Sequence, residues 1–269
     1  MSLSTQSFST VVDLFHRASG IRLAPVKKPL VEGRLQKLAA ERGMPDLNQY
    51  VQWLTTSGDT AERQRVIDKL TTNETYFFRE PQHFDLLARL AAGRAPGAGT
   101  LRVWSAASSS GEEAYSIAMV LADKLGVKTV AKPWEIVGTD LSTAMVATAR
   151  AALYPMDRAR NTPKDYLKRF CMRGQGAYDG KLLIAKDLRD HVSFREANLM
   201  QALPDIGSFD IIFLRNVLIY FDPPSKADIV KRVIGKLKPD GLLLTGHAES
   251  LPGAELGLRS VQPAVYELA

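Results

Sequence analysis

The chain has 269 residues, of which 45% are apolar and 24% charged, and its formal net charge is +6. This composition is typical of a globular protein with a full hydrophobic core, and it excludes a disordered, collagen-like or coiled-coil chain. No uncharged segment approaches the roughly 20 apolar residues of a membrane span, so we expect no membrane insertion. Asp13, His16 and Arg17 interrupt the first apolar stretch, which argues against a signal peptide. The single cysteine, Cys171, fits a reducing compartment, and we expect a cytoplasmic protein.

Residues 1–92 show the apolar spacing of amphipathic helices. Apolar positions recur three or four residues apart, first at Phe8, Val11, Val12 and Phe15 and later at Leu47, Tyr50, Val51 and Leu54. Asp46 is placed to cap the second of these helices. We predict a helical domain over residues 1–80 and a connecting helix and linker over 81–99, because Pro81 suits a first helical turn and the 93–99 segment is rich in glycine.

The segment 22–42 is strongly basic, with only Glu32 and Glu41 opposing its lysines and arginines. Nucleic acid, anionic lipid or an acidic protein surface would each suit such a segment, and so would an ordinary solvated helix. Charge alone does not choose among these partners.

From residue 100 the pattern changes to alternating strands and helices. The predicted strands are 101–105, 135–139, 192–194, 209–214 and 241–245. This alternation predicts a parallel sheet with helices on both faces, which binds ligands beyond the carboxyl ends of its strands. Residues 155–190 break the alternation, and their glycine-rich turn at 173–180 predicts a small hairpin-rich β-subdomain.

Acidic side chains follow the first two predicted strands. Asp140 can accept hydrogen bonds from both ribose hydroxyls of an adenosine cofactor. The loop at 105–111 has a single glycine, whereas a nicotinamide dinucleotide needs a glycine-rich turn for its pyrophosphate. Glu112 and Glu113 would repel a pyrophosphate and suit a cationic ligand, which favours S-adenosylmethionine over NAD. The same two glutamates also suit a helix N-terminus without any ligand.

Asn198 and Asn216 follow the next two strands, where an amide can serve an adenine edge or an amino-acid carboxylate. Each alone is a common turn residue, but their coincidence with Asp140 favours a ligand site. The segment 222–225 is similar to a motif of base-modifying methyltransferases, yet its last residue is a serine that cannot stack on a base. An N-cap followed by prolines explains this segment, so we expect no nucleic-acid partner.

The histidines and the cysteine show no spacing typical of metal ligands, and no serine lies in a hydrolase elbow. We therefore expect no metal cofactor.

Several segments together resemble the signatures of the CheR-type chemotaxis receptor glutamate O-methyltransferases. They are residues 72–80 (TNETYFFRE), 103–116, 213–221, 238–241 and 246–250, so the resemblance covers essentially the whole chain. Ser108 and Ala114 depart from the residues commoner in this family, and neither departure removes a functional group.

The resemblance implies an α/β protein with an all-helical N-terminal receptor-docking domain and a Rossmann-like class I S-adenosylmethionine-dependent methyltransferase domain. The second domain spans residues 100–269 and carries an inserted β-subdomain at 155–190. The resemblance further implies cofactor contacts from Asn73, Thr75, Arg79, Glu113, Asp140, Asn198, Leu199, Arg215 and Asn216. It gives Arg79 and Tyr220 catalytic roles.

The implied reaction esterifies specific glutamates on the cytoplasmic helical bundle of chemoreceptors, yielding glutamate 5-O-methyl esters and S-adenosylhomocysteine in chemotaxis adaptation. A glutamate with a pKa of about 4.3 is already ionised at neutral pH, so no general base is needed. Arg79 could orient the carboxylate through two hydrogen bonds and Tyr220 through one, and the sequence leaves open which dominates. A non-catalytic module that keeps the fold and a nucleotide-dependent dehydrogenase are the alternatives.

Two regions are candidates for holding the receptor, and we expect the enzyme to act as a monomer. Lys27, Arg34 and Lys37 are spaced along one side of a helix, which suits the glutamate-rich methylation helices. Residues 173–184 resemble the β-subdomain with which some family members bind a C-terminal receptor pentapeptide by adding a strand. The alternative for this segment is a structural hairpin without a partner.

Overall fold

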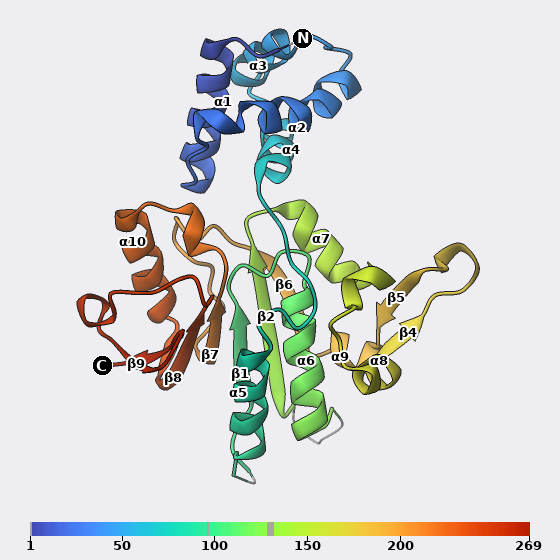
Figure 1. The fold of residues 1–269 in the computed structure, drawn as a ribbon, viewed down its shortest axis with the longest axis vertical. Helices are drawn as coiled ribbons and strands as arrows, with labels where there is room; N and C mark the ends of the chain where they lie inside the picture. Colours follow the sequence, from blue (N-terminus) through green and yellow to red (C-terminus); the bar gives the residue numbers. More distant parts are fainter. Residues whose placement is uncertain (1, 96, 128–131) are drawn as a thin grey trace.

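The computed structural model describes residues 2–95, 97–127 and 132–269, which form a helical part above an α/β part (Figure 1). The helical part contains α1 (Thr5–Ser19), η1 (Pro25–Lys27), α2 (Lys28–Glu41), α3 (Leu47–Thr56) and α4 (Thr60–Leu70). Asp46 caps α3, as predicted, by accepting a hydrogen bond from the Asn48 amide. The apolar faces of the four α-helices enclose a separate core, in which Phe15, Leu35 and Leu54 are almost completely buried.

The basic segment of the helical part differs from the expectation of one cationic helix face. Lys27 lies in η1, one residue before α2 begins. Arg34 is half-buried, and its Nη1 donates hydrogen bonds to the carbonyls of Leu70 and Thr71 at the end of α4. Lys37 forms a 4.0 Å ion pair with Glu41. The partners of Arg34 are tertiary and could not be predicted from helix periodicity, whereas Glu41 lies one turn after Lys37 in the same helix. The spacing of the cations alone therefore overestimated the number of unpaired charges.

A seven-stranded sheet lies at the centre of the α/β part. In spatial order its strands are β6 (Val192–Glu196), β2 (Trp134–Asp140), β1 (Leu101–Ser105), β7 (Phe209–Leu214), β8 (Leu237–Thr245), β10 (Val265–Leu268) and β9 (Leu258–Gln262). The first five are parallel, and β10 pairs antiparallel with both of its neighbours. Strand order reverses between β1 and β7, which leaves a crevice at their carboxyl ends.

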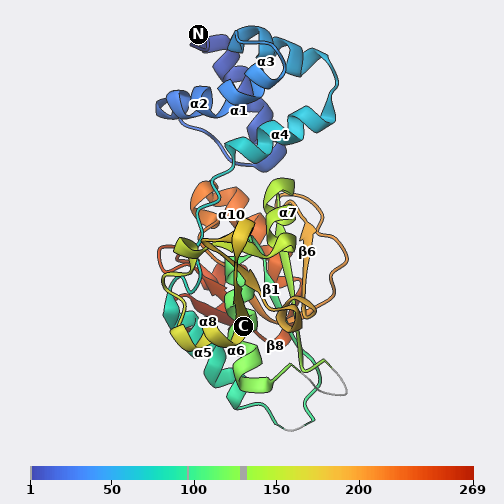
Figure 2. The same cartoon turned by 90° about the vertical axis from the view of Figure 1, so that its right-hand side faces the viewer.

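Helices cover both faces of this sheet, as predicted. On one face, α5 (Pro81–Ala92), α6 (Glu112–Leu125) and α7 (Thr143–Ala151) contribute to one apolar core. On the other face, α10 (Pro223–Ile234) packs in a second core with Trp104 and Ile212. Two views at right angles show the helical part standing above α7 and α10, over the end of the sheet where the crevice lies (Figures 1 and 2).

The inserted subdomain contains a three-stranded antiparallel sheet in the order β3 (Leu153–Pro155), β5 (Lys181–Ile184) and β4 (Cys171–Arg173). Its first strand begins two residues before the predicted boundary at 155. A short helix, α8 (Lys164–Phe170), joins β3 to β4, and a single turn, α9 (Lys186–Arg189), leads back to the main sheet. Periodicity did not reveal α8, because seven residues span only about two turns.

Candidate functional site

A pocket lies at the carboxyl ends of the parallel strands, where the helical part meets the sheet. Its volume is about 900 Å³ including the open mouth. All ten residues expected to bind the cofactor or act in catalysis line it: Asn73, Thr75, Arg79, Glu113, Asp140, Asn198, Leu199, Arg215, Asn216 and Tyr220. They come from the segment that follows α4, from the start of α6 and from the loops after β2, β6 and β7.

Asp140 ends β2 and is almost fully buried in the pocket wall. One carboxylate oxygen accepts a 2.8 Å hydrogen bond from the Ser109 amide, and the other accepts a 2.9 Å bond from the Ser142 amide. Burial raises the pKa of Asp140, and these two amides act against the rise. Both oxygens keep further lone pairs, so the group is suited to accept hydrogen bonds from a vicinal diol.

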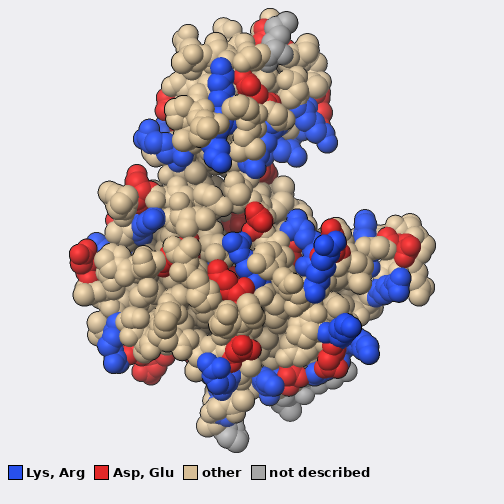
Figure 3. Space-filling view, viewed as in Figure 1, with Lys and Arg blue, Asp and Glu red and all other residues tan. Residues whose placement is uncertain are grey.

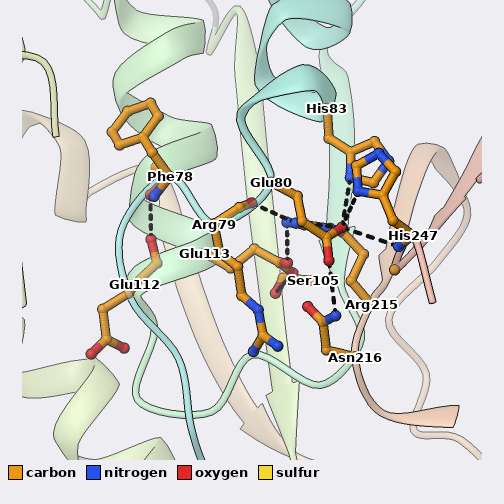
Figure 4. Close-up of polar contacts among 12 residues, drawn as sticks. Phe78, Arg79, Glu80, His83, Ser105, Glu112, Glu113, Arg215, Asn216 and His247 are labelled. Atoms are coloured by element: carbon orange, nitrogen blue, oxygen red, sulfur yellow. Dashed lines mark hydrogen bonds and ion pairs between the residues drawn. The ribbon is translucent and has the colours of Figure 1, made fainter. Parts of the chain in front are cut away.

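Glu113 and Arg215 form an ion pair on the pocket floor (Figure 4). Arg215 Nη1 donates a 2.9 Å hydrogen bond to Glu113 Oε2, and Ser105 donates a 2.7 Å bond to the other oxygen. Burial raises the pKa of Glu113, and the positive charge of Arg215 acts to lower it.

Glu112 does not line the pocket, contrary to its expected pairing with a cationic ligand. Its buried carboxylate instead accepts a hydrogen bond from Ser110, because adjacent helix positions point about 100° apart.

Glu80 connects the ion pair to the loop after β7. Its Oε2 lies 3.1 Å from Arg215 Nη2, and its Oε1 accepts a 3.0 Å hydrogen bond from Asn216 Nδ2. Burial opposes ionisation, but the Asn216 bond and the charges of Arg215 and His247 outweigh it and lower the pKa of Glu80 to about 2. Because the carboxylate fixes the amide nitrogen of Asn216, the amide oxygen remains an acceptor at the pocket.

The backbone is strained where the pocket is built. Phe78, Glu80, Ser109 and Asn216 have φ angles between 49° and 57° although none is a glycine. Left-handed conformations of such residues cost free energy and tend to occur at functional sites. Phe78 and Glu80 flank Arg79, whose carbonyl accepts a hydrogen bond from Arg215. The local fold thus fixes the peptide that carries Arg79.

Arg79 and Tyr220 belong to the same pocket and are both half-buried. Arg79 Nη1 donates a 3.0 Å hydrogen bond to the Glu74 carbonyl, and the guanidinium lies 5.8 Å from the centre of the Tyr76 ring. Burial raises the pKa of Tyr220, while the nearby charge of Arg79 acts in the opposite direction. The Tyr220 hydroxyl is therefore neutral at physiological pH and is available as a hydrogen-bond donor.

The helical part contributes one wall of the pocket through Ser19 and Ile21, which sequence reasoning missed. Asn198 lies against this wall, and its Nδ2 donates a 2.6 Å hydrogen bond to the carbonyl of Ala18, while its Oδ1 accepts one from Met200. Asn198 thus joins the two parts of the chain and also lines the pocket, and its contact with a cofactor stays a prediction. No local signal in the sequence could have revealed a bond that spans 180 residues.

A histidine cluster lies beside the pocket (Figure 4). His83 is buried without a hydrogen-bond partner for either ring nitrogen, and candidate ligand atoms of Glu80, His83 and His247 lie within 4.8 Å of one another. The two imidazole planes are parallel to within 4°, however, with centroids 4.8 Å apart. An ion bound by a ring nitrogen lies in that ring's plane, so one ion cannot serve both rings. The positively charged Arg215 is also close to Glu80, so this arrangement is not a preformed metal centre.

The residues of the pocket fit S-adenosylmethionine. Asp140 brings hydrogen-bond acceptors of the kind that ribose hydroxyls need, and Glu113 brings a carboxylate to the pocket. The loop after β1 lines the pocket with Ala106 and Ala107, where a pyrophosphate-binding loop has glycines. This set favours a sulfonium nucleoside over a dinucleotide.

Comparisons with known proteins agree with this fit. Residues 73–266 match the family model described as CheR methyltransferase, SAM binding domain, and residues 6–71 match CheR methyltransferase, all-alpha domain. The chain is 38% identical over 270 residues to a chemotaxis protein methyltransferase of Escherichia coli (strain K12), covering 100% of this chain and 93% of that protein. It is 39% identical over 265 residues to chemotaxis protein methyltransferase 2 of Pseudomonas aeruginosa PAO1, covering 98% and 93%.

The chain also aligns with a solved glycopeptide N-methyltransferase bound to S-adenosyl-L-methionine, over 59% of this chain and 51% of that protein, with 20% identity and a TM-score of 0.34. The fold and the matched domains define a Rossmann-like, S-adenosylmethionine-binding methyltransferase. The chain belongs to the CheR family of chemotaxis protein methyltransferases, as its motifs implied. Within the described residues, no helix is long and apolar enough to cross a membrane.

Proposed function

We propose that this protein transfers the methyl group of S-adenosylmethionine to glutamate side chains on the cytoplasmic helical bundle of chemoreceptors, giving glutamate 5-O-methyl esters. The observation that carries this proposal is that Arg79 and Tyr220 line one pocket, whose floor is the Glu113–Arg215 ion pair. A cationic group and a neutral hydroxyl suit an anionic acceptor. Glu80 and Glu113 both pair with Arg215, so the floor has one carboxylate in excess and suits a cationic donor.

The cofactor residues divide into three tasks. Asp140 holds the ribose, Glu113 faces the positive end of the donor, and the Asn216 amide oxygen accepts a hydrogen bond from its amino group. When bound, S-adenosylmethionine supplies a methyl group activated by its sulfonium. Burial of Asp140 and Glu113 strengthens their hydrogen bonds with charged or hydroxylic partners.

The acceptor needs alignment rather than deprotonation. A glutamate carboxylate is ionised at neutral pH, so the task of the protein is to hold it in line with the methyl group, which contributes up to about 7–11 kcal/mol in ideal cases. The guanidinium of Arg79 orients the carboxylate. Charge is neutralised in the transition state, so a very tight ion pair would stabilise the ground state more. The Tyr220 hydroxyl offers a weaker contact that avoids this cost.

The helical part is the proposed docking surface for the methylation helices. Its Lys and Arg side chains gather along the rim that faces the α/β part (Figure 3). Arg34 of α2 donates a 3.1 Å hydrogen bond to the carbonyl of Thr71, which lines the pocket, so α2 lies close to the proposed site. Exposed ion pairs contribute about 0–1 kcal/mol each, so this docking is weak and sensitive to salt.

A second contact is proposed for the receptor tail at the inserted subdomain. Strand β4 ends the small sheet and pairs with β5 along one edge only, among the described residues. An open edge offers backbone groups to an added strand. A tail held there raises the local concentration of the methylation helices at the pocket.

The experiment is a methyl-transfer assay with labelled S-adenosylmethionine and a receptor cytoplasmic fragment, followed by mass spectrometry of base-labile esters. We expect glutamate esters with the wild-type chain, and no detectable turnover with Arg79→Ala although S-adenosylhomocysteine still binds. Arg89 is an exposed arginine on α5, and Arg89→Ala is the matched control. Cofactor binding without any ester would instead support a non-catalytic module.

A further inference from the structure

Glu249 occupies an unusual position beside the pocket. It follows β8 in a tight turn, and it is almost fully buried although its residue type is charged. Its carboxylate accepts three main-chain hydrogen bonds, from Asn216 at 2.6 Å, from Gly246 at 2.8 Å and from Ile219 at 3.2 Å. A buried carboxylate is stable in the folded chain only when such donors compensate for its lost hydration.

Two of these donors belong to the loop that carries pocket residues. Asn216 opens the loop in a left-handed conformation with φ of 56°, and Ile219 immediately precedes Tyr220 in the turn η4 (Leu218–Tyr220). Oxygen Oε2 of Glu249 holds the first of these amides and Oε1 holds the second. One side chain therefore clamps both ends of the loop.

Gly246, in the turn after β8, leaves space for the Glu249 carboxylate because it has no side chain. A Cβ atom on Gly246 would lie 2.7 Å from both Asn216 Nδ2 and Glu249 Oε2. A side chain at position 246 would displace these two atoms, one of which belongs to the carboxylate that holds the Asn216 amide. The backbone of the turn after β8 is thus fitted closely to the loop after β7.

We propose that Glu249 is a positioning residue that fixes Asn216 for the cofactor and Tyr220 for the acceptor. The role of Glu249 in placing Tyr220 for the acceptor rests on the proposed function. Its role in placing Asn216 for the cofactor does not, because that role requires only that the cofactor binds. Glu249 does not line the pocket, so it acts through the loop and not on the reacting atoms.

The test compares Glu249→Gln, Glu249→Ala and Gly246→Ala. Glutamine keeps one carbonyl acceptor and alanine keeps none, so we expect a graded loss of kcat that reaches about 100-fold in Glu249→Ala, the scale expected for a misplaced catalytic group. The KM for the receptor should change much less, because docking involves other surfaces. Gly246→Ala should likewise lower kcat with little change in the KM for the receptor, because its methyl group would displace the Glu249 carboxylate. Glu255→Gln, at an exposed glutamate, is the matched control.

Calorimetry with S-adenosylhomocysteine provides a readout independent of the acceptor. We expect weaker binding in the same order as the loss of kcat, measured on protein whose folding is verified by circular dichroism. If folded Glu249→Ala retains wild-type affinity and kcat, the residue is only structural and the proposal is wrong. If the wild-type chain forms no glutamate ester while the variants still lose affinity, the proposed function fails but the cofactor half of this inference stands.

Discussion

The side-chain nitrogen of Asn198 donates a 2.6 Å hydrogen bond to the carbonyl of Ala18, which joins the loop after β6 to the last turn of α1. Next to this bond, Met200 packs so closely that a Cβ atom on Gly20 would lie 2.5 Å from its Cγ. Because Ser19 and Ile21 line the pocket, this contact sets one of its walls. We therefore expect the position of the helical part to affect cofactor binding.

Changes at Asn198 should test this coupling. Asn198→Asp places a carboxylate oxygen against the Ala18 carbonyl, whereas Asn198→Ala only removes a hydrogen bond worth about 1 kcal/mol. We expect S-adenosylhomocysteine to bind several-fold more weakly to the alanine variant, and more weakly still to the aspartate variant, by calorimetry. Asn48→Ala removes a comparable amide within the helical part and should leave affinity unchanged. Equal affinities for all variants would show that this wall does not matter for the cofactor.

Asp140 should be indispensable for cofactor binding. We expect Asp140→Ala to abolish calorimetric binding of S-adenosylmethionine, because two charge-assisted hydrogen bonds to the ribose contribute about 1.5–3 kcal/mol each. The variant also leaves the amides of Ser109 and Ser142 without their acceptor, so its folding must be verified first. Asp228→Ala, at an exposed aspartate of α10, is the control. Binding by folded Asp140→Ala within tenfold of wild type would contradict the ribose assignment.

These residues also show what the sequence could and could not predict. Asp140 and Asn216 were predictable because they follow strands of a parallel sheet, and the carboxyl ends of those strands meet at one edge. The assignment of Arg79 to the pocket came from the family motif rather than from periodicity. Glu80 was missed, since its partners Arg215 and Asn216 lie more than 130 residues away in the chain.

Local rules failed where tertiary contacts decide the outcome. Arg34 matched a cationic helix face, but the structure uses its guanidinium to cap α4. Glu112 matched a ligand carboxylate, but it is buried beside Ser110 and lies 3.5 Å from Arg158. Both predictions relied on the type of side chain. They failed because the direction of each side chain is decided by residues far away in the chain or by packing, which a local pattern does not contain.

His83 should make the stability of the fold depend on pH. Burial and the charge of Arg215 lower its pKa from 6.5 to about 4. As the pH falls below 6.5, the unfolded chain takes up a proton that the folded chain does not, so the free energy of unfolding decreases. Between pH 7.5 and pH 5 this difference amounts to about 2 kcal/mol. Glu80, with a pKa of about 2, also contributes to the free energy of unfolding. Its contribution is lost only as the pH falls below the unfolded value of 4.5, outside the range from pH 7.5 to pH 5.

Urea unfolding at pH 7.5 and pH 5 measures this effect. We expect His83→Phe, which keeps a ring of similar size and removes the titration, to lose about 2 kcal/mol less stability between the two pH values than wild type. His16→Gln changes a half-buried histidine of α1, a helix of the separate core of the helical part, and should keep the pH dependence of wild type. The same pH dependence in all three proteins would rule out His83 as the source.

The inserted subdomain should bind a receptor tail through β4. Its edge is open, and Met172 and Tyr178 are about half exposed, at 48% and 55%. Gly174 shapes the turn after β4, since a Cβ atom there would lie 1.9 Å from the Tyr178 carbonyl oxygen. We expect a C-terminal receptor pentapeptide to bind by calorimetry, and Arg173→Ala and Gly174→Ala to weaken it, because the first removes a cation beside the added strand and the second distorts the edge. In a methylation assay, a receptor fragment without its tail should keep its kcat and show a higher KM, since the tail acts only on local concentration.

Arg89→Ala is the control for the peptide titration. A peptide that fails to bind, or that binds all variants equally, would leave the helical part as the only proposed receptor contact.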